Sequence, residues 1–113
     1  MAYDEHTTAR LREALGPMTG LSEKRMMGGM CFVLNGNMIG GADRPKDGVS
    51  RFMFRVGKDN QHKGNAMPLA QPMEMAGRKM GGFFFVEADD CDEDLLRQWI
   101  ALALNFVEKL PPK

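Results

Sequence analysis

The chain has 113 residues, of which 43% are hydrophobic and 27% are charged, and its formal net charge is zero. This length has room for one modest core, so we expect a single domain over residues 1–113. The zero net charge excludes a global field that would draw the protein to nucleic acid or to a membrane surface. No apolar run approaches the roughly 18 to 20 residues that a membrane-spanning helix needs.

The charges are nevertheless distributed unevenly. Between Asp43 and Lys79 there are eight basic and four acidic residues, whereas Glu87 to Asp94 contains six acidic residues and no basic one. This pattern predicts a dipolar molecule, which matters for its partners more than for its fold.

The two cysteines, Cys31 and Cys91, are far apart and have no metal-type spacing. No signal-peptide pattern is visible either. We therefore expect reduced thiols and a cytoplasmic protein.

The first elements expected are a helix and a strand. Asp4 is the candidate N-cap of a helix that runs to about Leu15, where Gly16-Pro17 ends it. Glu23–Met27 predicts a strand, and the following Gly28-Gly29 pair predicts a bulge or a close backbone approach.

Asn35-Gly36 between two apolar runs predicts a tight hairpin, because both turn positions need positive φ. The expected arms are Met30–Leu34 and Asn37–Gly41, with Leu34 opposite Asn37, Val33 opposite Met38 and Phe32 opposite Ile39. Alternation puts Met30, Phe32, Leu34 and Ile39 on one face and Cys31, Val33 and Met38 on the other. Since both faces are apolar, we expect both to be covered, one by helices and one by a loop, another helix or a second subunit.

Further strands are expected at Arg51–Val56, Met73–Ala76 and Phe83–Glu87, with one or two helical turns in Gly57–Gly64. A last helix follows an acidic start, and its apolar stripe includes Leu95, Trp99, Leu102, Phe106 and Val107. The acidic start is interpreted as a set of groups that cap the helix and match its dipole, because the spacing of a calcium loop is missing. These groups are Asp90, Asp92, Glu93 and Asp94. The order predicts an α+β fold, with an antiparallel sheet of about five strands flanked by the N- and C-terminal helices.

Four motifs stand out together along the chain: Glu23–Gly29, the strand after it with Gly36-Asn37-Met38, Phe52–Gly57, and Pro72–Met80. By these motifs the chain resembles the TfoX N-terminal domain family (TfoX/Sxy-like proteins) over nearly its whole length. It departs at Met27, where phenylalanine is usual, and at Asp43–Ser50, which looks longer than the typical link. The resemblance implies a small α+β domain, somewhat like secretion chaperones and often dimeric. The family's namesakes regulate competence genes but carry a second, C-terminal domain.

The leading hypothesis is a non-enzymatic interaction domain with a regulatory role linked to transcription or competence. We expect a homodimer, and the candidate dimer face is the second face of the hairpin, Cys31, Val33 and Met38. A further protein partner fits the same hypothesis.

Direct nucleic-acid binding is the first alternative. A basic strand and loop face would carry it through Arg25, Arg51, Arg55, Lys58, Arg78 and Lys79, with Arg44, Lys46 and Lys63 as further cations. The zero net charge favours an ordinary solvated surface instead, and no helix-turn-helix, zinc or aromatic–basic RNA motif is visible.

A small-ligand-binding or enzymatic domain is the second alternative. Its reactive groups would be His62, Cys91 or Cys31, but the sequence shows no Ser-His-Asp, paired-acid or metal spacing. We therefore expect no catalytic residues, no cofactor and no metal.

Overall fold

A computed structural model describes residues 5–26, 28–45, 48–75 and 77–113. The helices are α1 (Glu5–Leu15), α2 (Gln61–Asn65), α3 (Glu93–Val107) and the short 3-10 helix η1 (Lys58–Asn60). The strands are β1 (Leu21–Met26), β2 (Gly29–Leu34), β3 (Asn37–Asp43), β4 (Arg51–Arg55), β5 (Gln71–Met75) and β6 (Arg78–Glu87).

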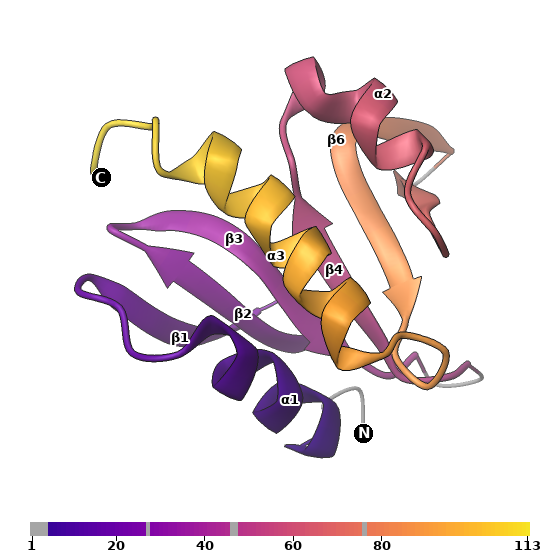
Figure 1. The fold of residues 1–113 in the computed structure, drawn as a ribbon, viewed down its shortest axis with the longest axis horizontal. Helices are drawn as coiled ribbons and strands as arrows, with labels where there is room; N and C mark the ends of the chain where they lie inside the picture. Colours follow the sequence, from indigo (N-terminus) through magenta and orange to yellow (C-terminus); the bar gives the residue numbers. More distant parts are fainter. Residues whose placement is uncertain (1–4, 27, 46–47, 76) are drawn as a thin grey trace.

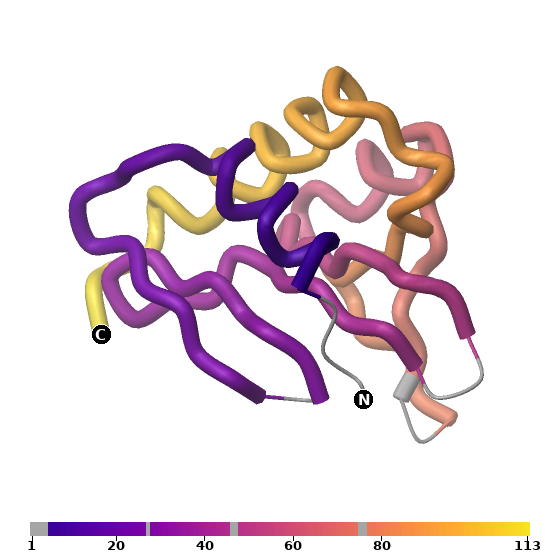
Figure 2. The backbone as a smooth tube through the Cα atoms, turned by 90° about the horizontal axis from the view of Figure 1, so that it is seen from below, coloured from indigo at the N-terminus to yellow at the C-terminus, as the bar shows by residue number. Residues whose placement is uncertain are grey.

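The strands form one antiparallel sheet with the order β1-β2-β3-β4-β6-β5. Helices α1 and α3 lie against one face of this sheet (Figure 1), and Figure 2 shows both helices on the same side of the strands. The predicted α+β class, with an antiparallel sheet flanked by terminal helices, is confirmed. The described sheet has six strands. No helix in the described ranges is both long enough and apolar enough to cross a bilayer.

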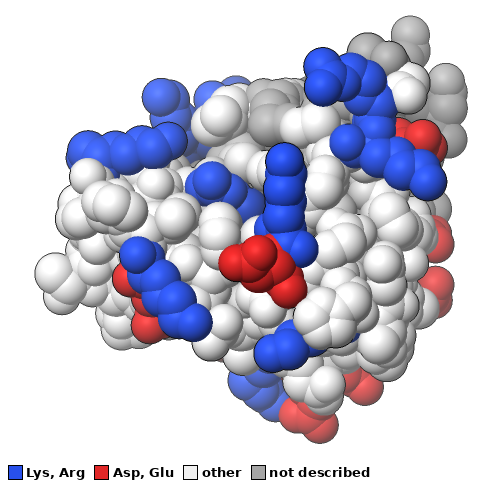
Figure 3. Space-filling view, turned by 90° about the horizontal axis from the view of Figure 1, so that it is seen from above, with Lys and Arg blue, Asp and Glu red and all other residues white. Residues whose placement is uncertain are grey.

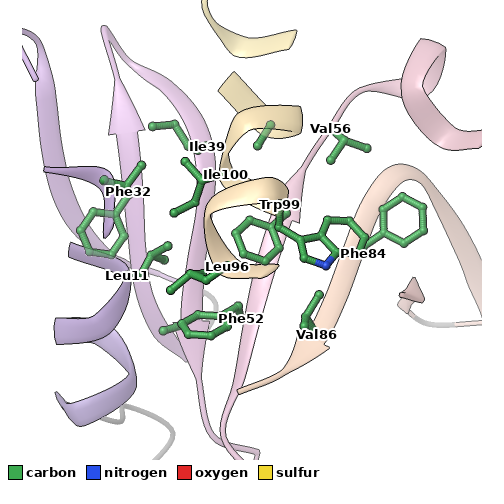
Figure 4. Close-up of a cluster of buried hydrophobic side chains, with 14 of the residues drawn as sticks. Leu11, Phe32, Ile39, Phe52, Val56, Phe84, Val86, Leu96, Trp99 and Ile100 are labelled. Atoms are coloured by element: carbon green, nitrogen blue, oxygen red, sulfur yellow. The ribbon is translucent and has the colours of Figure 1, made fainter. Parts of the chain in front are cut away.

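The main core fills the space between the sheet and the two helices. Trp99 of α3 is fully buried and stacks on Phe54 of β4, with ring centroids 5.5 Å apart and an interplanar angle of 10°. Phe84 of β6 packs against the same indole at 5.4 Å, and Figure 4 shows these rings among buried aliphatic side chains. The indole Nε1–H donates to the Pro68 carbonyl at 3.3 Å, so the one polar atom of the ring is satisfied.

Arg10 of α1 ties the two covering helices together. Its guanidinium donates to the carbonyl oxygens of Ala88 and Cys91, at 2.8 and 2.5 Å, and forms an ion pair with Glu93 at the start of α3. The predicted capping of α3 by its acidic start is confirmed for Asp92. Its carboxylate accepts a hydrogen bond from the Leu95 N–H at 2.8 Å as the helix N-cap. The predicted N-cap of the first helix, Asp4, lies outside the described residues.

Of the two alternatives predicted for the Gly28-Gly29 pair, a bulge or a close backbone approach, the close approach is confirmed and the bulge is not. Gly28, at φ 77°, lies in the β1–β2 turn and not in a bulge, since Met26 pairs with Gly29 across that turn. The expected close backbone approach does occur at Gly29, where a Cβ would lie 2.4 Å from the Ala42 carbonyl oxygen.

The hairpin of β2 and β3 keeps the predicted turn and its first two pairs, Leu34 with Asn37 and Val33 with Met38. Asn35 and Gly36 have φ values of 52° and 86°, as this turn requires. Phe32 then pairs with Gly40 and not with Ile39, because a bulge shifts the register. Gly40 permits this arrangement, since a Cβ there would lie 2.1 Å from the Met53 carbonyl oxygen.

Candidate functional site

The sheet face opposite α1 and α3, called the open face below, carries a second and smaller apolar cluster. Cys31 of β2, Met53 of β4 and Met73 of β5 are at most 7% exposed and pack together, with Met38, Phe83 and Phe85 half-buried around them. These side chains alternate along their strands with the residues of the main core, so they point away from the helices. The predicted second face of the hairpin is therefore only partly covered within the described chain.

A groove of about 420 Å³ opens over this cluster. Its lining consists of Met26, Gly29, Met30, Cys31, Gly41, Ala42, Asp43, Arg51, Met53, Met73, Glu74 and Phe85. Gly41 lies between Cys31 and Met53 in the cross-strand row. A Cβ at Gly41 would lie 2.5 Å from the Met30 carbonyl oxygen, so only glycine fits there. Its missing side chain leaves space at the bottom of the groove.

Arg51 forms one wall of the groove in a fixed orientation. Its Nε and Nη2 donate to the two Asp43 carboxylate oxygens at 2.8 and 3.2 Å. Its Cζ lies 3.6 Å from the centroid of the Phe85 ring, so the guanidinium lies over the face of that ring. Arg55, four residues along the same strand, lies over Phe106 of α3 at 5.2 Å.

Two further hollows extend from the groove toward the end of the molecule that carries α2. One is lined by Lys58, Gln61, Pro72, Met73, Lys79, Met80 and Gly81, and it shares Met73 with the groove. The other is lined by Arg55, Gly57, Lys58, Asp59, Gly81, Gly82, Phe83 and Phe106. Since Lys58 and Gly81 belong to both hollows, the three depressions form one path across β4, β6 and β5.

The six cations predicted from the sequence are only partly brought together. Arg55, Lys58 and Lys79 converge around Gly81, whereas Arg51 is paired with Asp43. Arg25 lies on β1, three strands away from β4 in the sheet order. Arg78 is exposed at the start of β6, opposite Met75 of the neighbouring strand. Among the other cations, Arg44 lies just past β3, Lys63 on α2, and Lys46 outside the described residues.

The predicted separation of charge is present only in part, because Arg51 of the basic stretch pairs across the sheet with Glu87 of the acidic one. Exposed lysines Lys58, Lys63, Lys109 and Lys113 belong to η1, α2 and the C-terminal segment. Figure 3 views this end, where Lys and Arg cover more of the surface than Asp and Glu, which lie among them. The exposed acids Asp89, Asp90, Asp92, Glu93 and Asp94 gather at the start of α3, at the opposite end of that helix.

The comparison with protein families decides the assignment. The sequence model of the TfoX N-terminal domain matches residues 13–107, which is most of the chain and includes every strand, the groove and α3. The chain belongs to the TfoX N-terminal domain family. No curated protein and no solved structure gave a match.

This TfoX N-terminal domain keeps both of its cysteines as free, buried thiols. Burial raises the pKa of Cys31, and the nearby Asp43 carboxylate raises it further. Burial likewise raises the pKa of Cys91 to about 11, against the opposing effect of Arg10 and with a further rise from Asp92 and Glu93. Both thiols therefore stay protonated near neutral pH, where a thiol is a poor nucleophile.

The other candidate reactive group, His62, is exposed on α2, and neither His62 nor Cys91 lines any of the three depressions. In the described part of the chain, no group of three or more His, Cys, Asp or Glu side chains is placed to hold a metal ion. Of the predicted dimer face, Cys31 is 3% exposed, whereas Val33 and Met38 are half-buried and paired with each other.

We expect the stability of the domain to fall as the pH rises above about 9. The thiol of Cys91 loses its proton near its usual value of 9.0 in the unfolded chain but near 11 in the folded domain. Between these two pH values the free energy of unfolding falls by up to about 1.4 kcal/mol per pH unit, because only the unfolded state releases the proton. Urea denaturation of the wild type and of Cys91→Ala at about pH 8 and about pH 10.5 measures this slope. In Cys91→Ala the free energy of unfolding should fall less steeply with pH than in the wild type. Equal slopes in both proteins would contradict the raised pKa of Cys91.

Proposed function

We propose that this TfoX N-terminal domain is a non-enzymatic interaction domain with a regulatory role, acting in the cytoplasm. The observation that carries the proposal is the open face, where half-buried apolar side chains stand within reach of a macromolecular partner. The protonated, buried thiols support binding over nucleophilic chemistry. The link to transcription or competence rests on the role of the family's namesakes.

We propose that the first partner is a second copy of this chain, docked on the β2–β3 half of the open face. Val33 and Met38 form a half-buried apolar pair there, and a two-fold axis through such a pair would place it against itself. Two features favour a second copy. The net charge is zero, so two copies do not repel each other as wholes, and the separated charges attract when two copies lie antiparallel.

The mass of the protein in solution tests this dimer. At about 50 µM we expect a light-scattering mass near twice the 12.6 kDa of the chain. Val33→Asp and Met38→Asp should each return the mass to one chain, because a carboxylate would be buried unpaired in the contact. Val49→Asp is the matched control, since Val49 is 47% exposed in the loop after β3.

A wild-type protein that stays monomeric at this concentration would overturn the homodimer. A dimer that survives both substitutions, with folding verified by circular dichroism, would place the contact elsewhere on the molecule.

A further inference from the structure

Aromatic and basic side chains lie next to each other on the open face of β4 and β6. Phe83 and Phe85 are two residues apart on β6, so their side chains project from the same face and their Cα atoms are about 7 Å apart. Arg55 of β4 pairs directly with Phe83, and Arg51 lies over the Phe85 ring. Both phenylalanines are half-buried, which leaves part of each ring accessible.

The guanidinium of Arg51 is held as a flat platform. The two hydrogen bonds to Asp43 fix its plane, and the Phe85 ring supports it from below at 3.6 Å. Its side chain is still 29% exposed, so its outer surface is open to a ligand. A planar cation in a fixed orientation is a stacking surface for another planar group.

Three cations continue the path beyond this platform. Arg55, Lys58 and Lys79 line the two connected hollows around Gly81. In the described ranges none of the three takes part in an ion pair, so no carboxylate neutralises their charges. Arg55 contacts the ligand from its position over the Phe106 ring of α3. Asp59 lines one of the hollows and reduces the local positive charge, so we expect the attraction to be moderate.

We propose that this path binds single-stranded nucleic acid, an activity that goes beyond the interaction role proposed above. Unpaired bases stack on Phe83 and on the outer surface of the Arg51 guanidinium, while Arg55, Lys58 and Lys79 contact the phosphates. An antiparallel sheet with exposed aromatic rings on one face is a known way to stack two or three bases. A duplex keeps its bases stacked inside, so it can use the cations but not the rings. An acidic protein segment could also use the cations, but it has no need of the two stacking surfaces.

Fluorescence anisotropy with labelled oligo(U) and oligo(dT) of about 12 nucleotides tests the proposal at about 50 mM salt. We expect both strands to bind, and a duplex of the same length to bind at least about fivefold more weakly. Three phosphate contacts predict that log K falls with log salt with a slope of about −2. Lys58→Ala/Lys79→Ala should reduce this slope to about −0.7, because one cation remains.

Two further variants separate stacking from charge. Phe83→Leu keeps an apolar side chain but removes the ring, and we expect at least about fivefold weaker binding with an unchanged salt slope. Lys63→Ala/Lys109→Ala removes the same charge from the same end of the molecule but outside the path, so binding should change by less than about twofold. Cooperative thermal unfolding of each variant well above the assay temperature shows that the fold is intact.

Three results would overturn the proposal. The first is no binding of either oligonucleotide at this salt concentration. The second is that duplex and single strand bind equally well and that Phe83→Leu weakens neither, because binding would then rest on electrostatic attraction alone. The third is that polyglutamate displaces the labelled oligonucleotide as well as unlabelled oligo(U) does at the same concentration of charge. That result would assign the path to acidic protein segments.

Discussion

Trp99→Ala is expected to lower the free energy of unfolding by about 3–5 kcal/mol, the largest loss for any single side chain of the core. The indole is fully buried between Phe54 and Phe84, so its removal leaves a cavity bordered by two large rings from two strands. The total stability of a domain this size is about 5–15 kcal/mol, so the variant should lose a large part of it. Urea denaturation followed by circular dichroism measures the change.

Trp99→Phe is the matched control for this cavity. The smaller ring keeps an aromatic contact with Phe54 but loses the hydrogen bond to the Pro68 carbonyl. We expect a loss of about 1–2 kcal/mol, clearly smaller than for alanine. A loss below about 1 kcal/mol for Trp99→Ala would contradict the placement of this side chain at the centre of the core.

The sequence was sufficient for most of the local structure, because local chemistry determines it. The Asn35-Gly36 turn needs positive φ at both positions, and the apolar spacing of α3 is visible without any partner. The assignment of Phe32, Leu34 and Ile39 to the helix-covered face follows from alternation and is confirmed. The bulge at Ile39 was not predictable in this way, because it depends on how closely Gly40 approaches β4, a strand that is distant in sequence.

The candidate site was predictable only in part, for a related reason. Alternation put Arg51 and Arg55 on one face of their strand, and Arg51 does lie there over Phe85, whereas Arg55 at the strand end lies over Phe106 of α3. The pairing of β4 with β6 joins residues that are 28 to 36 positions apart in the sequence. That pairing creates the contact between Arg51 and Phe85, and no sequence pattern shows it. The signal that was available is the Phe83-Phe84-Phe85 run. Alternation leaves Phe83 and Phe85 on the face opposite Phe84 and beside the strand that carries the arginines.

Gly82→Ala is expected to destabilise the domain by about 3 kcal/mol or more. Gly82 has φ 82°, a region that costs a residue with a Cβ about 1–2 kcal/mol. A Cβ there would also lie 2.5 Å from the carbonyl carbon of Gly57 and 2.8 Å from the Lys58 nitrogen, and both are backbone atoms. The Gly82 carbonyl accepts from Val56 N–H at 2.7 Å, and its N–H donates to the Gln61 side chain at 2.5 Å. The substitution therefore forces β6 away from η1 and weakens both hydrogen bonds.

Gly16→Ala separates the two causes of this loss. Gly16 has φ 69°, but a Cβ there would have no atom within 4 Å, so only the backbone strain of about 1–2 kcal/mol remains. The difference between the two variants in urea denaturation measures the contact between β6 and η1. The contact between β6 and η1 sets the distance between Lys58 and Lys79 across Gly81. Under conditions where the variant is still folded, Gly82→Ala should therefore also weaken oligonucleotide binding. Gly16→Ala should leave this binding unchanged. Equal stabilities of the two variants would show that the backbone of β6 does not need glycine for this approach, and the hollows would then owe their shape to side chains alone.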